Sequence, residues 1–82
     1  MDRQTKRRVL NVVLYQTSPA QDEWASESTL KVVAVAHESV PKGKFDDALD
    51  ELEEEGKIES QDGKYRTCEG VTRMPHEGEI IR

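Results

Sequence analysis

One segment, residues 41–66, most constrains what this chain can fold into, because a helical pattern there runs directly into a hairpin pattern. Four apolar residues recur at the i, i+3, i+4, i+7 spacing of an amphipathic helix: Phe45, Ala48, Leu49 and Leu52. A helix with this spacing buries one stripe and exposes the rest of its surface. The segment therefore predicts a helix that packs on a core.

The residues at the ends of this helix favour a hairpin directly after it. Pro41 has the fixed φ that suits a first helical turn, and Gly56 is placed to end the helix. Ile58 resumes an extended pattern. Asp62-Gly63 accepts the positive φ angles of a two-residue turn, and residues 65–67 supply a return strand of good β-formers.

Two further helices are predicted before this segment. Residues 3–16 place apolar side chains toward one side and polar ones toward the other. Residues 29–38 contain a valine and alanine run that fits a buried helix or a buried strand; its length, its alanines and an N-cap at Ser26 or Ser28 favour a helix. In the first helix the apolar side comprises Val9, Leu10, Val13 and Leu14, and the polar side comprises Arg7, Arg8, Asn11 and Tyr15.

The segments between the helices are short or without periodicity. Residues 18–28 hold a proline and polar side chains and are interpreted as a connection, in which Trp24 is expected to pack on the edge of the core. Residues 38–41 are short enough to turn the second helix steeply into the third. We expect one folded body over residues 1–67 and a mobile tail over residues 68–82, where Ile80-Ile81 is a weak candidate for an edge strand.

Length and motifs argue against catalysis and against a metal site. A chain of 82 residues with one small core has little enclosed volume for a catalytic pocket, and no nucleophile-elbow or phosphate-loop pattern is present. We therefore expect no enzyme and no cofactor. Cys68 and His76 lack the partners of a tetrahedral metal site. His37 shares a helical side with Leu30 and Val33, so we expect it to be partly buried and hydrogen-bonded.

Charge and hydropathy limit the compartment and the partners. A net charge of −5 argues against a protein that coats nucleic acid by positive potential alone. No stretch approaches the roughly 18 consecutive apolar residues of a membrane span, and the N-terminus lacks the apolar core of a signal peptide. A single cysteine cannot form an intramolecular disulfide. We expect a cytoplasmic protein with no membrane partner.

The order helix, connection, helix, turn, helix, hairpin resembles the winged helix-turn-helix superfamily over roughly residues 3–67. The most specific part is residues 45–58 followed by Lys64-Tyr-Arg-Thr, which is also similar to the C-terminal winged helix of archaeal MCM helicases. The resemblance implies an α+β fold of three helices with a C-terminal β-hairpin wing. It further implies a small DNA-binding protein of transcription regulation or replication, with the third helix as the recognition helix and residues 60–66 as the wing.

By this resemblance, double-stranded DNA would be contacted by basic residues at the edges of the domain, because helix N-termini favour phosphate and a wing arginine can enter a minor groove. Residues 46–55 carry seven carboxylates and no base off the apolar stripe, so full insertion of that helix into a groove is not expected. The alternative for each cation is a solvated or ion-paired surface group. The candidates are Lys42 and Lys44 at the start of the third helix, Lys64 and Arg66 on the wing, and Arg7 and Arg8 on the first helix.

The cations of the first helix and the carboxylates of the third allow other interpretations. The cluster Arg3, Lys6, Arg7 and Arg8 lies next to a helix N-terminus, where positive charge is unfavourable, and pairing with the acidic third helix would explain it. The carboxylates either form a solubilising surface or dock a basic protein partner or a second copy of the chain. In the docking interpretation the partner-binding residues are Asp47, Glu51 and Glu54.

Overall fold

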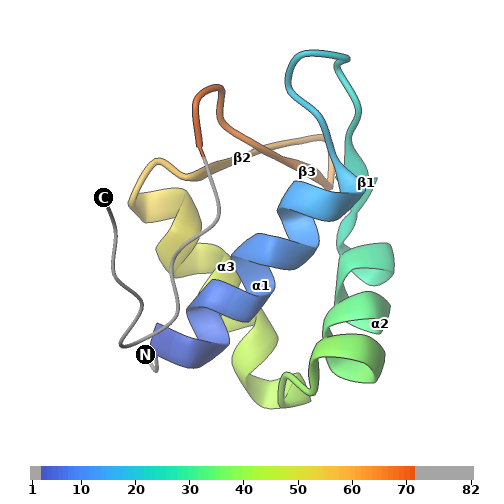
Figure 1. Ribbon diagram of the computed structural model, residues 1–82, viewed down its shortest axis with the longest axis vertical. Coiled ribbons are helices and arrows are strands. Elements are labelled where there is room, and N and C mark those ends of the chain that lie inside the picture. The colour runs from blue at the N-terminus through green and yellow to red at the C-terminus, as the bar shows by residue number, and fades with distance from the viewer. Residues whose placement is uncertain (1–2, 72–82) are drawn as a thin grey trace, which may run out of the picture.

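Figure 1 shows the computed structural model, in which residues 3–71 are described. These residues form three helices, α1 (Arg3–Gln16), α2 (Glu27–Glu38) and α3 (Lys42–Glu54), and three short strands, β1 (Ala25–Ser26), β2 (Ile58–Gln61) and β3 (Lys64–Thr67). The strands make one antiparallel sheet in the order β1-β3-β2. The predicted α+β class, with three helices and a hairpin after the third, is confirmed. The interpretation of residues 18–28 as connection alone was wrong, because it missed β1.

The core lies where α1 meets α3, α2 and the sheet. All four residues of the predicted stripe on α3 are buried, and none is more than 1% exposed. They join residues of α1 and α2 in one apolar cluster, with Val9, Leu10, Val13 and Leu30 fully buried. Burial of a large apolar side chain contributes roughly 1.5–3 kcal/mol, so this cluster is the main source of stability.

Helix α1 is more enclosed than its sequence pattern indicates. Arg7 and Asn11, which were predicted on its polar side, are only 7% and 9% exposed, and Val12 is buried as well. The reason is that α1 packs against α2, α3 and β3, so that most of its circumference is covered. The prediction of a single apolar side for this helix was therefore wrong.

Strand β3 is the centre of the sheet. Tyr65 pairs with Ser60 of β2 on one side and with Ala25 of β1 on the other. The predicted two-residue turn is confirmed, since Asp62 and Gly63 both have positive φ, +52° and +76°. The two strands of the hairpin thus follow α3 with only a short connection.

Helix α2 begins and ends with side-chain and backbone caps. Ser26, one of the two predicted N-cap residues, accepts a hydrogen bond from the amide of Thr29 at 3.3 Å. Ser39 ends the helix in the left-handed conformation, with φ +57°. His37 is exposed, so the prediction that it is partly buried was wrong. It lies in the last turn, next to the point where the chain turns toward α3, whereas Leu30 and Ala34 form the buried side.

The chain continues past β3 along the body. The amide of Cys68 donates to the carbonyl of Lys57 at 3.0 Å, and Val71 packs against the core. His76 and the proposed edge strand at Ile80-Ile81 lie outside the described residues. Within residues 3–71 no helix has the length and apolarity needed to cross a membrane.

Substitutions of Gly63 in the turn and Gly43 in α3 should have opposite effects on stability. A Cβ added at Gly63 or at Gly43 would meet no atom within 4 Å, so backbone conformation alone decides the outcome. Gly63→Ala should lower the free energy of unfolding by about 1 kcal/mol because alanine is strained at positive φ. Gly43→Ala, inside α3, should raise it by roughly 0.5–1 kcal/mol. Urea denaturation measures both; a Gly63→Ala variant as stable as the parent would contradict the described turn.

Candidate nucleic-acid interface

The first turn of α3 is cationic and open to solvent. Lys42, Gly43 and Lys44 are all exposed, and the turn contains no acidic residue. The N-cap residue Pro41 makes no side-chain capping hydrogen bond. The amide of Lys44 donates to the carbonyl of Pro41 at 3.0 Å, whereas the amides of Lys42 and Gly43 precede the first intrahelical hydrogen bonds. Such a helix start favours an anion.

Helix α2 differs from α3 in this respect. Its N-terminal amides are capped by Ser26, and Glu27 occupies its first turn. A carboxylate in that position interacts favourably with the helix dipole and repels an incoming phosphate. The two helix starts therefore have opposite preferences for an external anion.

The wing lysine lies away from this helix start. Lys64 is exposed and follows the hairpin turn directly. Figure 1 shows the sheet at the end of the molecule opposite the turn between α2 and α3, so the lysines of α3 and of the hairpin are at the two ends of the fold. The structure does not gather the predicted cations into one cluster.

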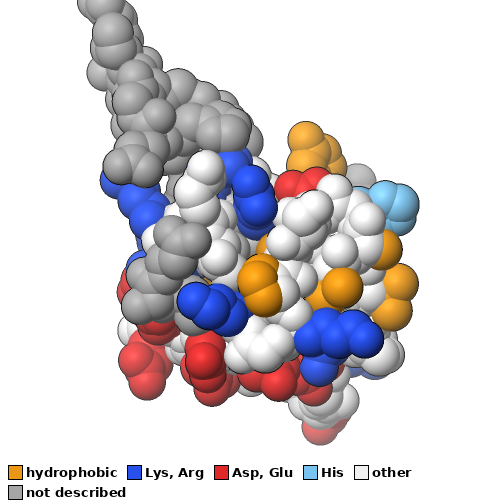
Figure 2. All heavy atoms as spheres, turned by 90° about the horizontal axis from the view of Figure 1, so that it is seen from below, with side chains coloured by type: hydrophobic (Ala, Val, Ile, Leu, Met, Phe, Trp, Pro, Cys, Tyr) orange, Lys and Arg blue, Asp and Glu red, His pale blue; other side chains and the backbone are white. Residues whose placement is uncertain are grey.

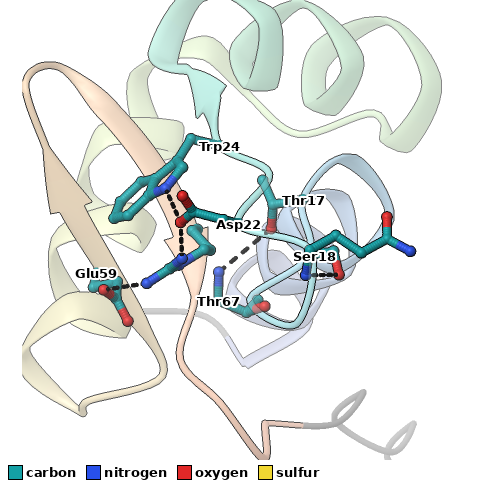
Figure 3. A network of polar contacts seen from close by, with 8 residues as sticks. Thr17, Ser18, Asp22, Trp24, Glu59 and Thr67 are labelled. Carbon is teal, nitrogen blue, oxygen red and sulfur yellow. Dashed lines mark hydrogen bonds and ion pairs between the residues drawn. The ribbon is translucent and has the colours of Figure 1, made fainter.

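Arg66, the other predicted wing contact, is held inside a polar network. Its guanidinium bonds Asp22 Oδ1 at 2.6 Å and Glu59 Oε1 at 3.0 Å, and its Cζ lies 4.2 Å from the centroid of the Trp24 ring. The indole Nε1 of Trp24 donates to the same Asp22 oxygen at 3.0 Å. Figure 3 shows Trp24, Asp22 and Glu59 around this guanidinium. Trp24 is half-buried, and its ring stacks on the Arg66 guanidinium. The sequence had predicted that this side chain packs on the edge of the core.

This network ties the segment before β1 to the hairpin. The Arg66 side chain is only 17% exposed, and its Nε is buried without a hydrogen-bond partner among the described residues. Nearby, the amide of Thr67 donates to Thr17 Oγ1 at 3.4 Å, and that hydroxyl donates to the carbonyl of Val13 at 2.7 Å. Two carboxylates neutralise the guanidinium charge, so Arg66 acts as a structural residue that links these segments.

Two of the cations of α1, Lys6 and Arg7, also have side-chain partners inside the fold. Arg7 donates from Nε and Nη2 to Gln4 Oε1, at 3.2 and 2.9 Å. Lys6 bonds Glu55 and lies 3.6 Å from Glu51. The hydrogen bond with Glu55 raises the pKa of Lys6 and lowers the pKa of Glu55. The expected pairing between α1 and the acidic helix is thus confirmed for this lysine, while Arg8 remains half-buried on α1.

The outer face of α3 beyond its first turn is acidic. Of the three residues in the docking interpretation, Asp47 and Glu54 are exposed, and Glu51 is half-buried beside Lys6. A hollow of about 410 Å³ is lined by Lys44 together with Asp47, Asp50 and Glu51. Figure 2 shows acidic side chains gathered along one edge of the face seen there, with basic side chains beside them. Carboxylates therefore adjoin Lys44 on this side of the helix.

A second acidic group lies between the start of α2 and α3. A hydrogen bond to Asp46, together with burial and like charge, raises the pKa of Glu27. Burial and the surrounding carboxylates of Glu27, Glu53, Asp50 and Asp46 raise the pKa of the Tyr65 phenol. The surface along the flank of α3 toward the sheet is therefore strongly unfavourable for phosphate.

The described residues contain no group of three or more histidine, cysteine, aspartate or glutamate side chains that could hold a metal ion. The sequence matches no protein-family model. Comparison with curated proteins and with solved structures finds no significant match either.

The Glu27–Asp46 contact predicts a pH-dependent stability difference. Because the folded state raises the pKa of Glu27, the contact stabilises most below the ordinary carboxyl pKa, and this stability is lost as the pH rises through the raised pKa of Glu27. Asp46→Asn should therefore stabilise the protein at pH 7, by roughly 0.5 kcal/mol or less, and the gain should shrink below about pH 4. Urea denaturation at both pH values measures it.

Asp47→Asn is the matched control, since Asp47 is an exposed carboxylate on the same helix. It reports the general effect of removing one negative charge from an acidic protein. Equal gains for the two variants at every pH would show that the Glu27–Asp46 contact has no energetic role.

Proposed function

We propose that this chain is a small winged-helix protein that binds the backbone of double-stranded DNA, as an accessory of transcription regulation or replication. The element order α1, β1, α2, α3, β2, β3 and the hairpin directly after α3 support this proposal, because they agree with the layout that the resemblance implies. Fold alone does not carry a function, so the argument rests on the site.

The observation that carries the proposal is the uncapped, basic start of α3. Lys42 and Lys44 are exposed there, and Gly43 leaves the backbone open to a phosphate oxygen. Amides at a helix start and two ammonium groups would act together on one phosphate. Asp47 and Glu54 would keep the rest of the helix out of the groove, so the proposed contact is to the backbone and is weakly selective for sequence.

Lys64 on the hairpin supplies a second contact in this proposal. It pairs with Ser26 at the start of α2, whereas Lys42 and Lys44 follow the end of that 12-residue helix, which is about 18 Å long. The two ends of the fold would therefore reach different phosphates along the duplex. Arg7 and Arg66 are assigned to internal support, because their guanidinium groups already have partners inside the fold.

The exposed acidic face supports a second candidate function, a protein-interaction module. Asp47, Glu51 and Glu54 would then present carboxylates to a basic partner. In this case substitution of the lysines should have no effect on binding, whereas Glu54→Lys should weaken it. The DNA proposal thus depends on the lysines, whereas the protein-interaction proposal depends on the carboxylates.

Fluorescence anisotropy with a labelled duplex at several salt concentrations tests the DNA proposal. Binding should weaken with salt, with a slope of a few units in a plot of log affinity against log salt. The double variant Lys42→Gln/Lys44→Gln should reduce the magnitude of this slope by about 1, because the two lysines act on one phosphate and each phosphate contact contributes about 1.

Lys57→Gln is the matched control, since Lys57 pairs with Glu55 near the other end of α3. It removes one positive charge, half of what the double variant removes, and should leave the slope nearly unchanged. Absence of duplex binding at low salt would contradict the proposal. A loss for the control half as large as that for the double variant would show that only net charge is being measured.

A further inference from the structure

Helix α2 has an apolar outer face that no described part of the chain covers. Val32 is 64% exposed, and Tyr15 is the only other large apolar side chain within residues 3–71 with comparable exposure. A groove of about 470 Å³ runs along this face and is lined by Ser28, Lys31, Val32, Val35, Ala36 and Lys42. Figure 2 shows hydrophobic side chains reaching the surface on the side of α2, next to basic ones.

The residues of this face follow the spacing of a helix–helix seam. Ser28, Val32 and Val35 are separated by four and three positions, and the helix ends at Glu38 before a further step. Alternating steps of four and three keep one stripe toward a partner helix. A two-fold axis between Val32 and Val35 places Val32 of each copy against Val35 of the other, so the stripe matches its own antiparallel copy.

The charges beside the stripe are also self-complementary. Lys31 and Glu38 are seven positions apart, which places them two turns apart on the same edge of α2. Both are half-buried, and neither forms an ion pair within residues 3–71; the charge of Lys31 acts on Glu27, one turn before it. A two-fold axis between Val32 and Val35 reverses the direction of the helix and keeps this edge on the same side. Lys31 of each copy then faces Glu38 of the other.

From this geometry we infer that α2 is a self-association surface, on which two copies of the chain pair antiparallel through Val32 and Val35 with two reciprocal Lys31–Glu38 ion pairs. Such an interface is isologous and closed, so association stops at the dimer. Three turns of one helix bury less surface than a standard stable interface, so the dimer forms in the micromolar range or above. The inference does not rest on DNA binding, although Lys42 lines both this groove and the proposed phosphate site.

Sedimentation equilibrium of the full chain, from about 5 to 500 µM, tests this inference. The parent should show a reversible monomer–dimer equilibrium. Lys31→Glu alone, or Glu38→Lys alone, should weaken dimerisation about tenfold, because each places like charges at both symmetric contacts. The double variant Lys31→Glu/Glu38→Lys should restore the parent affinity to within about threefold, since it re-creates both pairs with reversed sign.

A second pair of variants tests whether dimerisation depends on this face of α2 or on any exposed apolar side chain. Val32→Asp should abolish the dimer, whereas Tyr15→Asp, at the other exposed large apolar residue, should leave it unchanged. A monomer at every concentration would overturn the inference. A dimer that survives Val32→Asp, or a double charge variant no better than the single ones, would overturn it as well, because association would then use another surface.

Discussion

The burial of one stripe of α3 against α1 is the constraint on which the rest of this structure depends. Phe45 and Leu52, at the two ends of the stripe, are completely buried. Once the stripe is inside, the remaining positions of the helix must face solvent, and most of them are carboxylates. The same packing fixes the position at which the chain leaves α3 and enters the hairpin. Surface charge and sheet position are thus both consequences of one apolar face.

A second interaction fixes the sheet relative to the helices. Arg66 on the central strand bonds Asp22 from the segment before β1 and Glu59 from β2, while Trp24 covers its guanidinium. An arginine with two carboxylate partners and an aromatic face is held in one geometry more firmly than a lysine would be. Arg66, which the resemblance implies as a contact in the DNA minor groove, therefore links three segments of the fold. This arrangement leaves Lys64 as the exposed cation of the hairpin.

Local patterns were sufficient to predict α3, the hairpin turn and a cap at Ser26 or Ser28, because each depends on residues within a few positions of one another. The pattern could not predict β1, since two residues have no periodicity and this strand exists only where β3 offers an edge. Contact between Asp22 and Arg66 joins residues 44 positions apart, and no local signal marks such a pair. The burial of Arg7 likewise depends on how many neighbours surround α1, which a helical wheel does not show.

The proposed division of α3, with a phosphate-binding first turn and an excluded acidic side, can be tested with one measurement. In an NMR titration of the full chain with a short duplex at low salt, amide shifts should change at Lys42, Gly43, Lys44 and Lys64, and those of residues 46–54 should stay nearly constant. Shifts concentrated along residues 46–54, or no shifts at all, would contradict this account.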